Sequence, residues 1–352
     1  MKSTIRKAGM KAALILAVAA AAVPSLQPEG LAEAAASQYA VIEQPVEVNG
    51  NRVSLSAINS DHTTYVAVRS LNDLIGLNTR WDQKSKTVTV TGRDRELALN
   101  TIDGSAVLND QRIYGLPAIL HNDTTYVPFR FLLERMGYGV SYDPETKEIG
   151  IEAIQENALR VTTGTIQEIE GRKSIRVHYP VLSGFAREDV QNAINEVLKK
   201  DAELNADLAR TTLANALEED DASYDVSFEG TYTVTYNEQD RLSLFVDYHS
   251  YTGGAHGLTA RVPYTFDLKT GKLLTLKDVT EGNGNYVSII NDTIQRQIKA
   301  RGIVLLNPFK TIEPDRDFFL KHNGVVVYFS EYEYTPYAAG MPEFETPFSA
   351  FR

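Results

Sequence analysis

Apolar and polar side chains alternate along residues 63–69, and the same alternation returns along residues 124–130. A period of two predicts a half-buried strand, because successive side chains of a strand point to opposite faces of a sheet. In both places the strand is followed by apolar residues at helical spacing, by a glycine (Gly76 or Gly137), and by two short apolar runs around a polar turn. The pattern therefore predicts a strand, a short helix and a hairpin, twice over.

The two segments are copies of one module. Thr-Thr-Tyr-Val opens both, and the register holds through the turn residues Asp82 and Asp143. The matching positions are mainly core and turn residues, so the duplicated object is a folding unit and not a reaction centre. Arg69 and Arg130 are also equivalent, and we expect them to hold turn carbonyls or acids, with binding of an anionic polymer as the alternative. The repeat therefore indicates that the first half of the chain presents or binds other molecules and does not catalyse a reaction.

Beyond residue 160 the pattern changes to an irregular mixture of strands and helices, which predicts an α+β fold with a largely antiparallel sheet. Residues 188–217 form the longest predicted helix. Its apolar face is predicted to comprise Val190, Ile194, Val197, Leu204, Leu208 and Leu217. The other predicted elements are strands at 174–182, 224–229, 231–236, 242–248, 260–266 and 325–329 and a second helix at 285–301. The whole chain is thus predicted to be α+β, a duplicated β-rich module followed by an α+β domain with two helices.

The N-terminus has the pattern of a secretory signal peptide. Residues 12–23 are an apolar run, and small residues follow at 32–37. The run is shorter than the roughly 20 residues that span a bilayer, so a retained anchor is the weaker interpretation. Cleavage after Ala34 or Ala36 fits equally well. We expect a signal peptide at 1–36, no membrane span after cleavage, and domains at 37–156 and 160–352. The basic residues ahead of the run are Lys2, Arg6, Lys7 and Lys11.

Charge and cysteine content narrow the function classes. Removing residues 1–36 takes four basic and two acidic residues from totals of 35 and 46, which leaves 31 and 44 and a net charge of −13. A phosphate backbone would be repelled, so nucleic acid is excluded as a partner, whereas a cationic protein or a metal-rich wall polymer would be attracted. The chain has no cysteine, which excludes disulfides, thiolate metal sites and a cysteine nucleophile. An exported protein without disulfides suits a Gram-positive cell surface.

One local cluster has the character of metal ligands or of an acid and base. Asp247 and His249 lie on the same face of a predicted strand, and the glycine loop that follows could return His256 towards them. The simpler interpretation is that Gly253 and Gly254 supply positive φ for a tight connection, while His256 bonds to loop carbonyls. The chain contains neither a Gly-x-Ser-x-Gly elbow nor a His-Glu-x-x-His motif. No catalytic residue is therefore assigned.

Tyrosines and glutamates crowd the end of the chain. They predict either a solvated edge of a β-rich domain or an acidic recognition face, because tyrosine combines apolar area with a hydrogen-bonding tip. Such a face would suit a cationic protein, and it would also suit sugar rings. The candidate binding residues are Tyr251, His256, Glu331, Glu333, Tyr334 and Tyr337.

The repeated T-T-Y-V-x-x-R strand and the D-x-x-x-K turn, over residues 46–153, resemble the copper amine oxidase N-terminal-like domain of exported Gram-positive proteins. The resemblance implies an appended stalk or surface module that holds no copper. The sequence is consistent with this, since it lacks both a His-x-His pair and the Asn-Tyr-Asp/Glu motif of the oxidase cofactor.

Residues 251–257 (YTGGAHG), 266–271 (FDLKTG) and 337–340 (YAAG) resemble the extracellular domain of RsiV-type anti-sigma factors. The same domain precedes the catalytic domain of PdaC-type peptidoglycan deacetylases. The resemblance implies a non-catalytic envelope domain, which in RsiV-type proteins recognises lysozyme. Eleven residues precede the apolar run and the chain stops at Arg352, so we expect neither a sigma-binding region nor a deacetylase domain.

Together these patterns predict a secreted, cell-wall associated binding protein without enzymatic activity or cofactor. Its predicted partner is a cationic protein such as lysozyme or a cell-wall glycan. The alternative is a metal-assisted hydrolase of cell-wall polymer that uses Asp247, His249 and His256.

Overall fold

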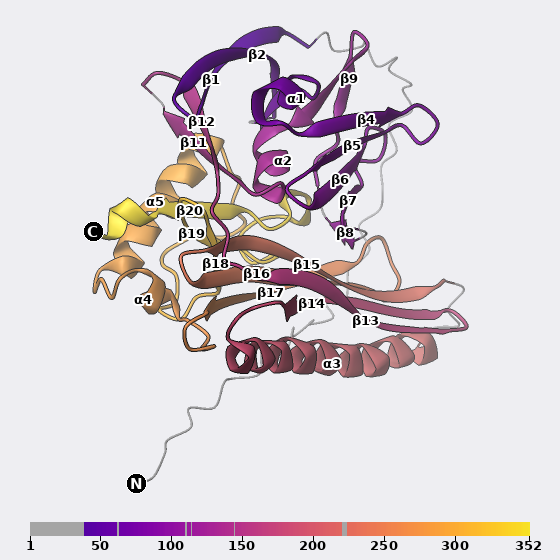
Figure 1. Cartoon of the computed structure of the whole chain (residues 1–352). Coiled ribbons are helices and arrows are strands. Elements are labelled where there is room, and N and C mark those ends of the chain that lie inside the picture. Colours follow the sequence, from indigo (N-terminus) through magenta and orange to yellow (C-terminus); the bar gives the residue numbers. More distant parts are fainter. Residues whose placement is uncertain (1–38, 62, 110, 114, 144, 220–223) are drawn as a thin grey trace.

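The computed structural model describes residues 39–352 apart from 62, 110, 114, 144 and 220–223, so the predicted signal peptide lies outside the described residues. An N-terminal module of two sheets lies over one face of the central sheet of the C-terminal domain (Figure 1). The long helix α3 (Glu188–Glu219) covers the opposite face of that sheet. The predicted α+β class is confirmed.

The first sheet of the N-terminal module brings the two copies of the repeat together. The repeated strands β3 (Thr63–Ala67) and β10 (Thr124–Pro128) pair with each other, antiparallel, with Val66 opposite Val127. Asn49 and Gly50, both with positive φ, form the turn between β1 (Val41–Val48) and β2 (Asn51–Ser60). In sheet order the strands are β11 (Tyr138–Asp143), β12 (Glu148–Ala153), β1 (Val41–Val48), β2 (Asn51–Ser60), β3, β10 and β9 (Ile119–His121).

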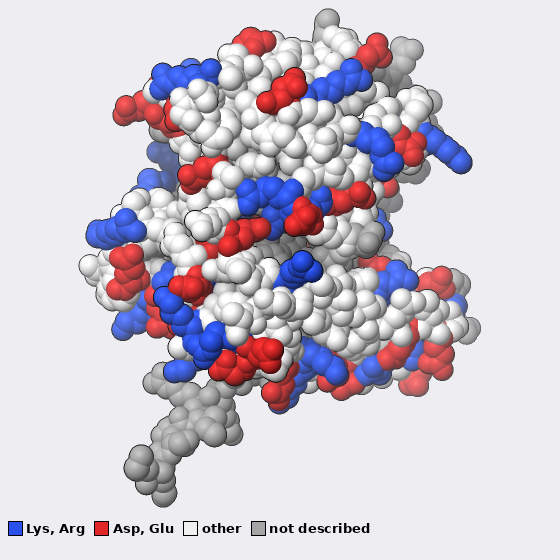
Figure 2. Space-filling model, viewed as in Figure 1, with Lys and Arg blue, Asp and Glu red and all other residues white. Residues whose placement is uncertain are grey.

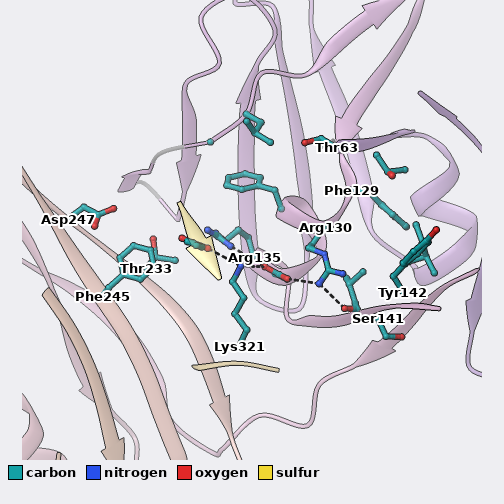
Figure 3. A pocket seen from close by; sticks show the side chains of 18 of the residues that line it. Thr63, Phe129, Arg130, Arg135, Ser141, Tyr142, Thr233, Phe245, Asp247 and Lys321 are labelled. Atoms are coloured by element: carbon teal, nitrogen blue, oxygen red, sulfur yellow. Dashed lines mark hydrogen bonds and ion pairs between the residues drawn. The ribbon is translucent and has the colours of Figure 1, made fainter. Parts of the chain in front are cut away.

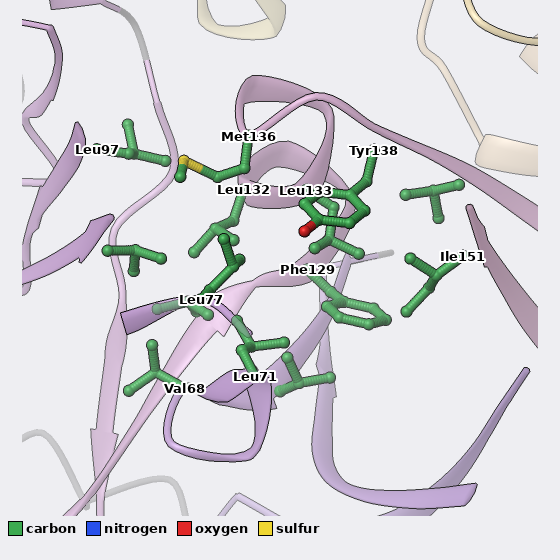
Figure 4. Packing of buried hydrophobic residues seen from close by; sticks show 14 of the residues in the cluster. Val68, Leu71, Leu77, Leu97, Phe129, Leu132, Leu133, Met136, Tyr138 and Ile151 are labelled. Carbon is green, nitrogen blue, oxygen red and sulfur yellow. The ribbon is translucent and has the colours of Figure 1, made fainter. Parts of the chain in front are cut away.

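The two copies diverge in where their hairpins go. The hairpin of the first copy, β4 (Asn78–Asp82) and β5 (Thr87–Gly92), opens the second sheet, whereas that of the second copy, β11 and β12, extends the first. The helices α1 (Ser70–Ile75) and α2 (Phe129–Arg135) contribute the equivalent core residues Leu71 and Leu132, both fully buried (Figure 4). The second sheet comprises β4 (Asn78–Asp82), β5 (Thr87–Gly92), β6 (Arg95–Asn100), β7 (Ala106–Leu108) and β8 (Gln111–Ile113).

The central sheet corrects one prediction from the sequence. The strands predicted at 224–229 and 231–236 form one continuous strand, β15 (Val226–Glu238). Gly230 lies within it because a Cβ there would lie 2.9 Å from Val177 and 3.0 Å from Tyr248, so only glycine fits under these side chains. In sheet order the strands are β13 (Arg160–Glu170), β14 (Lys173–Ser183), β15, β16 (Arg241–Tyr251) and β17 (Leu258–Asp267).

The buried face of α3 also differs from the predicted one. Its middle is lined by the small residues Ala202, Ala206 and Ala209, while the predicted core residue Leu208 is exposed. Small residues are needed there because Tyr264 points from the sheet and donates a hydrogen bond of 3.1 Å to Asp201 Oδ2. The buried face of this helix was therefore predicted wrongly, because the prediction considered only the positions of large apolar residues.

The C-terminal segment adds a third layer beside the central sheet. A small sheet of β18 (Phe318–Lys321), β19 (Gly324–Tyr328) and β20 (Glu343–Pro347) packs with α4 (Leu276–Val279) and α5 (Tyr286–Arg301) around one core. A second cluster, which includes Phe245 and Phe319, joins this sheet to the central one. Along the described part of the chain, no helix is long and apolar enough to cross a membrane.

Direct contacts link the N-terminal module to the C-terminal domain. The buried side-chain amide of Gln111 on β8 pairs with the backbone of β15, donating to Tyr232 O and accepting from Tyr232 N at 3.1 Å. Asn323, in the turn after β18, donates to Val140 O at 3.0 Å. In Figure 2 basic and acidic side chains are interspersed across the middle of the molecule, where the two parts meet. The boundary between residues 156 and 160 remains a prediction.

Candidate functional site

Three rings from distant parts of the sequence stack at one end of the C-terminal domain. The ring of His256, in the loop between β16 and β17, lies 3.8 Å from that of Tyr337, with 14° between their planes. The ring of Tyr332 lies 5.7 Å from that of Tyr337. Tyr332 Oη donates to His256 Nε2 at 3.1 Å, and His256 Nδ1 donates to Gly257 O at 3.0 Å. Both bonds form when the neutral imidazole carries its proton on Nδ1.

A carboxylate lies beside this stack. Glu331 Oε2 accepts a hydrogen bond of 2.8 Å from the backbone N–H of Thr259, at the free edge of β17. Burial, followed by the negative charge of Glu331, raises the pKa of Tyr337. Tyr332 is 46% exposed and has a φ of 62°, an uncommon conformation for a residue with a side chain. We call His256, Glu331, Tyr332 and Tyr337 the aromatic surface.

The glycine loop holds its shape through close packing. Gly253 and Gly254 have positive φ, as predicted, and a Cβ on Gly253 would lie 2.2 Å from the ring of Tyr224. Tyr251 Oη donates to Gly254 O at 3.0 Å. Tyr251 therefore fixes the loop that carries His256. Backbone conformation requires both glycines, and lack of space requires Gly253 in addition.

Two of the candidate binding residues, Glu333 and Tyr334, have structural partners within the domain. Glu333 forms two contacts of 2.6 Å with the guanidinium of Arg316 and accepts the backbone N–H of Ser330. The ring of Tyr334 is partly buried and packs 4.6 Å from that of Phe329, against the core of the C-terminal layer. The segment forms turns and not a strand, so the position of a residue in the sequence did not indicate which side chains face outwards.

The residues of the alternative metal site are separated by other interactions. Asp247, only 3% exposed, is held by Arg261 through contacts of 2.7 and 2.9 Å. His249 lies beside Gly257, while His256 belongs to the aromatic surface. The described residues contain no group of three histidine, aspartate or glutamate side chains that could hold a metal ion. The physical reason is Arg261, which lies directly opposite Asp247 on β17 and occupies its carboxylate.

Arg130, the arginine of the second repeat, has the structural partners expected of it. Its Nη1 donates to Val140 O at 2.9 Å and lies 3.4 Å from Glu134. Arg130 also lines a cavity between the N-terminal module and the central sheet. Neither the internal repeat nor the spacing of residues in the sequence predicted this cavity.

Comparison with known families divides the chain in the same way. Residues 47–151 match the copper amine oxidase N-terminal domain. Residues 169–259 match the family described as deacetylase PdaC, and residues 277–349 match a family of unknown function, DUF3298. The predicted order of a stalk-like module followed by an RsiV-type and PdaC-type domain is confirmed.

One curated relative is the anti-sigma-V factor RsiV of Bacillus subtilis, 30% identical over 200 residues. The match covers 53% of this chain and 67% of that protein. Two solved structures of DUF3298 proteins, from Bacteroides fragilis and Pseudomonas aeruginosa, are 19% and 18% identical, each with a TM-score of 0.39. Each match covers 55% of this chain and 91% of the solved one.

Proposed function

The chain belongs to the family of the anti-sigma-V factor RsiV, and on that premise we propose that it is a secreted, non-catalytic binding protein of the cell envelope. Its C-terminal domain recognises a cationic protein of the lysozyme type, the ligand that the resemblance to RsiV-type proteins implies. The N-terminal module spaces or tethers this domain at the cell wall.

The aromatic surface is the observation that supports this proposal. It presents stacked rings with polar tips, the residue type that dominates protein interfaces, and its outermost ring, Tyr332, is half exposed. Glu331 adds a carboxylate beside the rings, and the whole chain has a net charge of −11. A basic partner would be steered towards this surface over a Debye length of about 8 to 10 Å.

The test is to measure association and dissociation rates of residues 37–352 with lysozyme on a sensor surface at several salt concentrations. Tyr337→Ala should speed dissociation by roughly 30-fold, the effect of losing a hot-spot tyrosine worth about 2 kcal/mol. Glu331→Gln keeps the acceptor for Thr259 but loses the charge, so it should slow association and flatten the salt dependence.

Ile169→Ala is the matched control, because Ile169 is 65% exposed on β13, at the opposite edge of the central sheet from β17. It should leave both rates unchanged. No binding at micromolar lysozyme, or equal effects of Tyr337→Ala and the control, would overturn the proposal. Retention of wall glycan in place of lysozyme would make a glycan the ligand of the aromatic surface.

A further inference from the structure

A cavity of about 710 Å³ lies between α2 and β11 of the N-terminal module and the central sheet (Figure 3). Its floor includes Thr233, Phe245 and Asp247, all buried, whereas Arg130 and Tyr142 at its other side are exposed. Cavities of about 300 to 1,000 Å³ with apolar walls and a few polar groups are typical binding sites for small molecules. The cavity is separate from the aromatic surface, and the proposed function does not use it.

The charged residues that line the cavity carry a net positive charge. Four basic side chains face three acidic ones, although the chain as a whole is acidic. Burial by itself would raise the pKa of Glu343, but its ion pairs with Lys321 and Arg261 lower that pKa to about 2. Each of the three carboxylates thus has a cation within 4 Å, and one positive charge remains in excess. The basic residues are Arg130, Arg135, Arg261 and Lys321, and the acidic ones are Glu134, Asp247 and Glu343.

Among the four basic residues of the cavity, Arg135 has the positive charge that nearby carboxylates balance least. Its side chain is 15% exposed and its only ion pair is a long one, 3.8 Å from Nη1 to Glu134 Oε2 as far as the chain is described. Among the described residues, no group accepts a hydrogen bond from its buried Nε. The ring of Phe131 lies 4.7 Å from the guanidinium and limits its movement. Nε is enclosed by the protein, so an acceptor supplied from outside the chain reaches Arg135 at its terminal Nη groups, where it balances the poorly compensated charge.

We propose that the cavity binds a small organic acid that carries one carboxylate on a partly apolar body. The carboxylate lies against the terminal Nη groups of Arg135, where a planar guanidinium can donate to both oxygens. The apolar part lies against Phe129 and Val140, while Thr231 and Thr233 offer hydroxyls to polar groups. A single negative charge on the ligand balances the excess charge of the lining.

Two acids test this chemistry with residues 37–352: N-acetylmuramic acid, a sugar acid, and N-acetyl-alanyl-alanine, a peptide acid. Their uncharged counterparts are N-acetylglucosamine and the dipeptide amide. The ¹H–¹⁵N resonance of Arg135 Nε should shift and exchange more slowly with water when an acid binds, and neither counterpart should have this effect. Whichever acid binds more tightly identifies the source of the ligand, a sugar or a peptide.

Arg135→Lys keeps the charge but removes the planar donor edge, and it should weaken binding of the acid by about 10- to 100-fold. Arg95→Lys is the matched control, because Arg95 also has a buried nitrogen without a partner in the described structure yet does not line this cavity. Its affinity for the acid should equal that of the unaltered chain. Thermal unfolding of both variants separates loss of binding from loss of fold.

Three outcomes would overturn the proposal. The first is an Arg135 Nε resonance that does not move at millimolar concentrations of either acid. The second is equal binding of the acids and their uncharged counterparts. The third is equal binding of dimethyl phosphate, which would show that the cavity selects a negative charge and not a carboxylate.

Discussion

His322 links the two parts of the molecule through two carboxylates. It lies in the turn after β18, where its Nδ1 contacts Glu238 of β15 at 2.8 Å and its Nε2 contacts Glu152 of β12. Gly139 makes room for it, since a Cβ there would lie 2.3 Å from the His322 ring. The hydrogen bond to Glu238 is the largest cause that raises the pKa of His322 to about 9, against the effect of burial. The junction is therefore expected to depend on pH.

The direction follows from the raised pKa. The protonated form of His322 is stabilised in the folded protein, so its contribution is complete below the unfolded value of 6.5 and is lost as pH rises through 9. At about 1.36 kcal/mol per pKa unit the upper limit is about 3 kcal/mol. His322 and Glu238 are 19% and 7% exposed, but Glu152 is 68% exposed, so solvent screens one of the two contacts. We expect about 1 to 2 kcal/mol.

Urea denaturation between pH 6.5 and 9.5 measures the contribution of His322 to the unfolding free energy, and NMR titration gives the pKa of His322 directly. The unaltered chain should lose about 1 to 2 kcal/mol of unfolding free energy over this range relative to His322→Gln, which cannot titrate. His178→Gln is the control, because burial lowers the pKa of His178 and it lies away from the junction. If His322 titrates near 6.5, or if His322→Gln keeps the full pH dependence, the reasoning is refuted.

Two further changes test the buried interactions of the C-terminal domain. Arg261→Met leaves the carboxylate of Asp247 buried without its partner and should lower the unfolding free energy by about 3 to 5 kcal/mol in urea denaturation. Adding Asp247→Asn should restore part of this loss. If the effects of the two changes on the unfolding free energy simply add, the pairing of these residues is contradicted. Tyr334→Ala should cost about 3 kcal/mol in the same assay by removing a ring packed on Phe329, whereas Tyr334→Phe should be nearly neutral; an unchanged midpoint for the alanine variant would show that Tyr334 is not part of the core.

Much of the fold could be predicted because the period of apolar residues reports directly which side of an element is buried. Val66 and Val127 of the repeated strands are fully buried, as this rule predicts. Their neighbours Tyr65 and Tyr126 are buried as well, so the prediction that these strands are half-buried was wrong: a second apolar cluster covers their other face. The period of apolar residues does not indicate which sheet a hairpin joins. The sequence therefore could not predict that the hairpins of the two copies belong to different sheets. Gly230 ended a predicted strand because glycine usually marks a turn, whereas here it makes room for the ring of Tyr248.

The candidate site could be predicted only in part. Aromatic and acidic residues in two separate segments indicated a recognition face, and the structure brings His256 and Tyr337 into contact. Tyr332 was not distinguishable from its neighbours, because its exposure depends on a positive φ that the sequence does not reveal. The metal alternative depended on Asp247 being available, and only the pairing of β16 with β17 shows that Arg261 occupies it.

The two copies of the internal repeat can be compared at the position of Arg135, which lines the cavity. At the constant offset of the repeat, Leu71 and Leu132 are identical core residues, but Leu74 of the first copy corresponds to Arg135 of the second. The two helices also differ in their surroundings, since α1 packs on β3 and β4 whereas α2 contacts β15 of the central sheet. Leu74 packs against the core of its own module, as a helical leucine should. Arg135, whose side chain is 15% exposed, brings a charge in place of apolar bulk to the equivalent position, and this charge lies in the lining of the cavity.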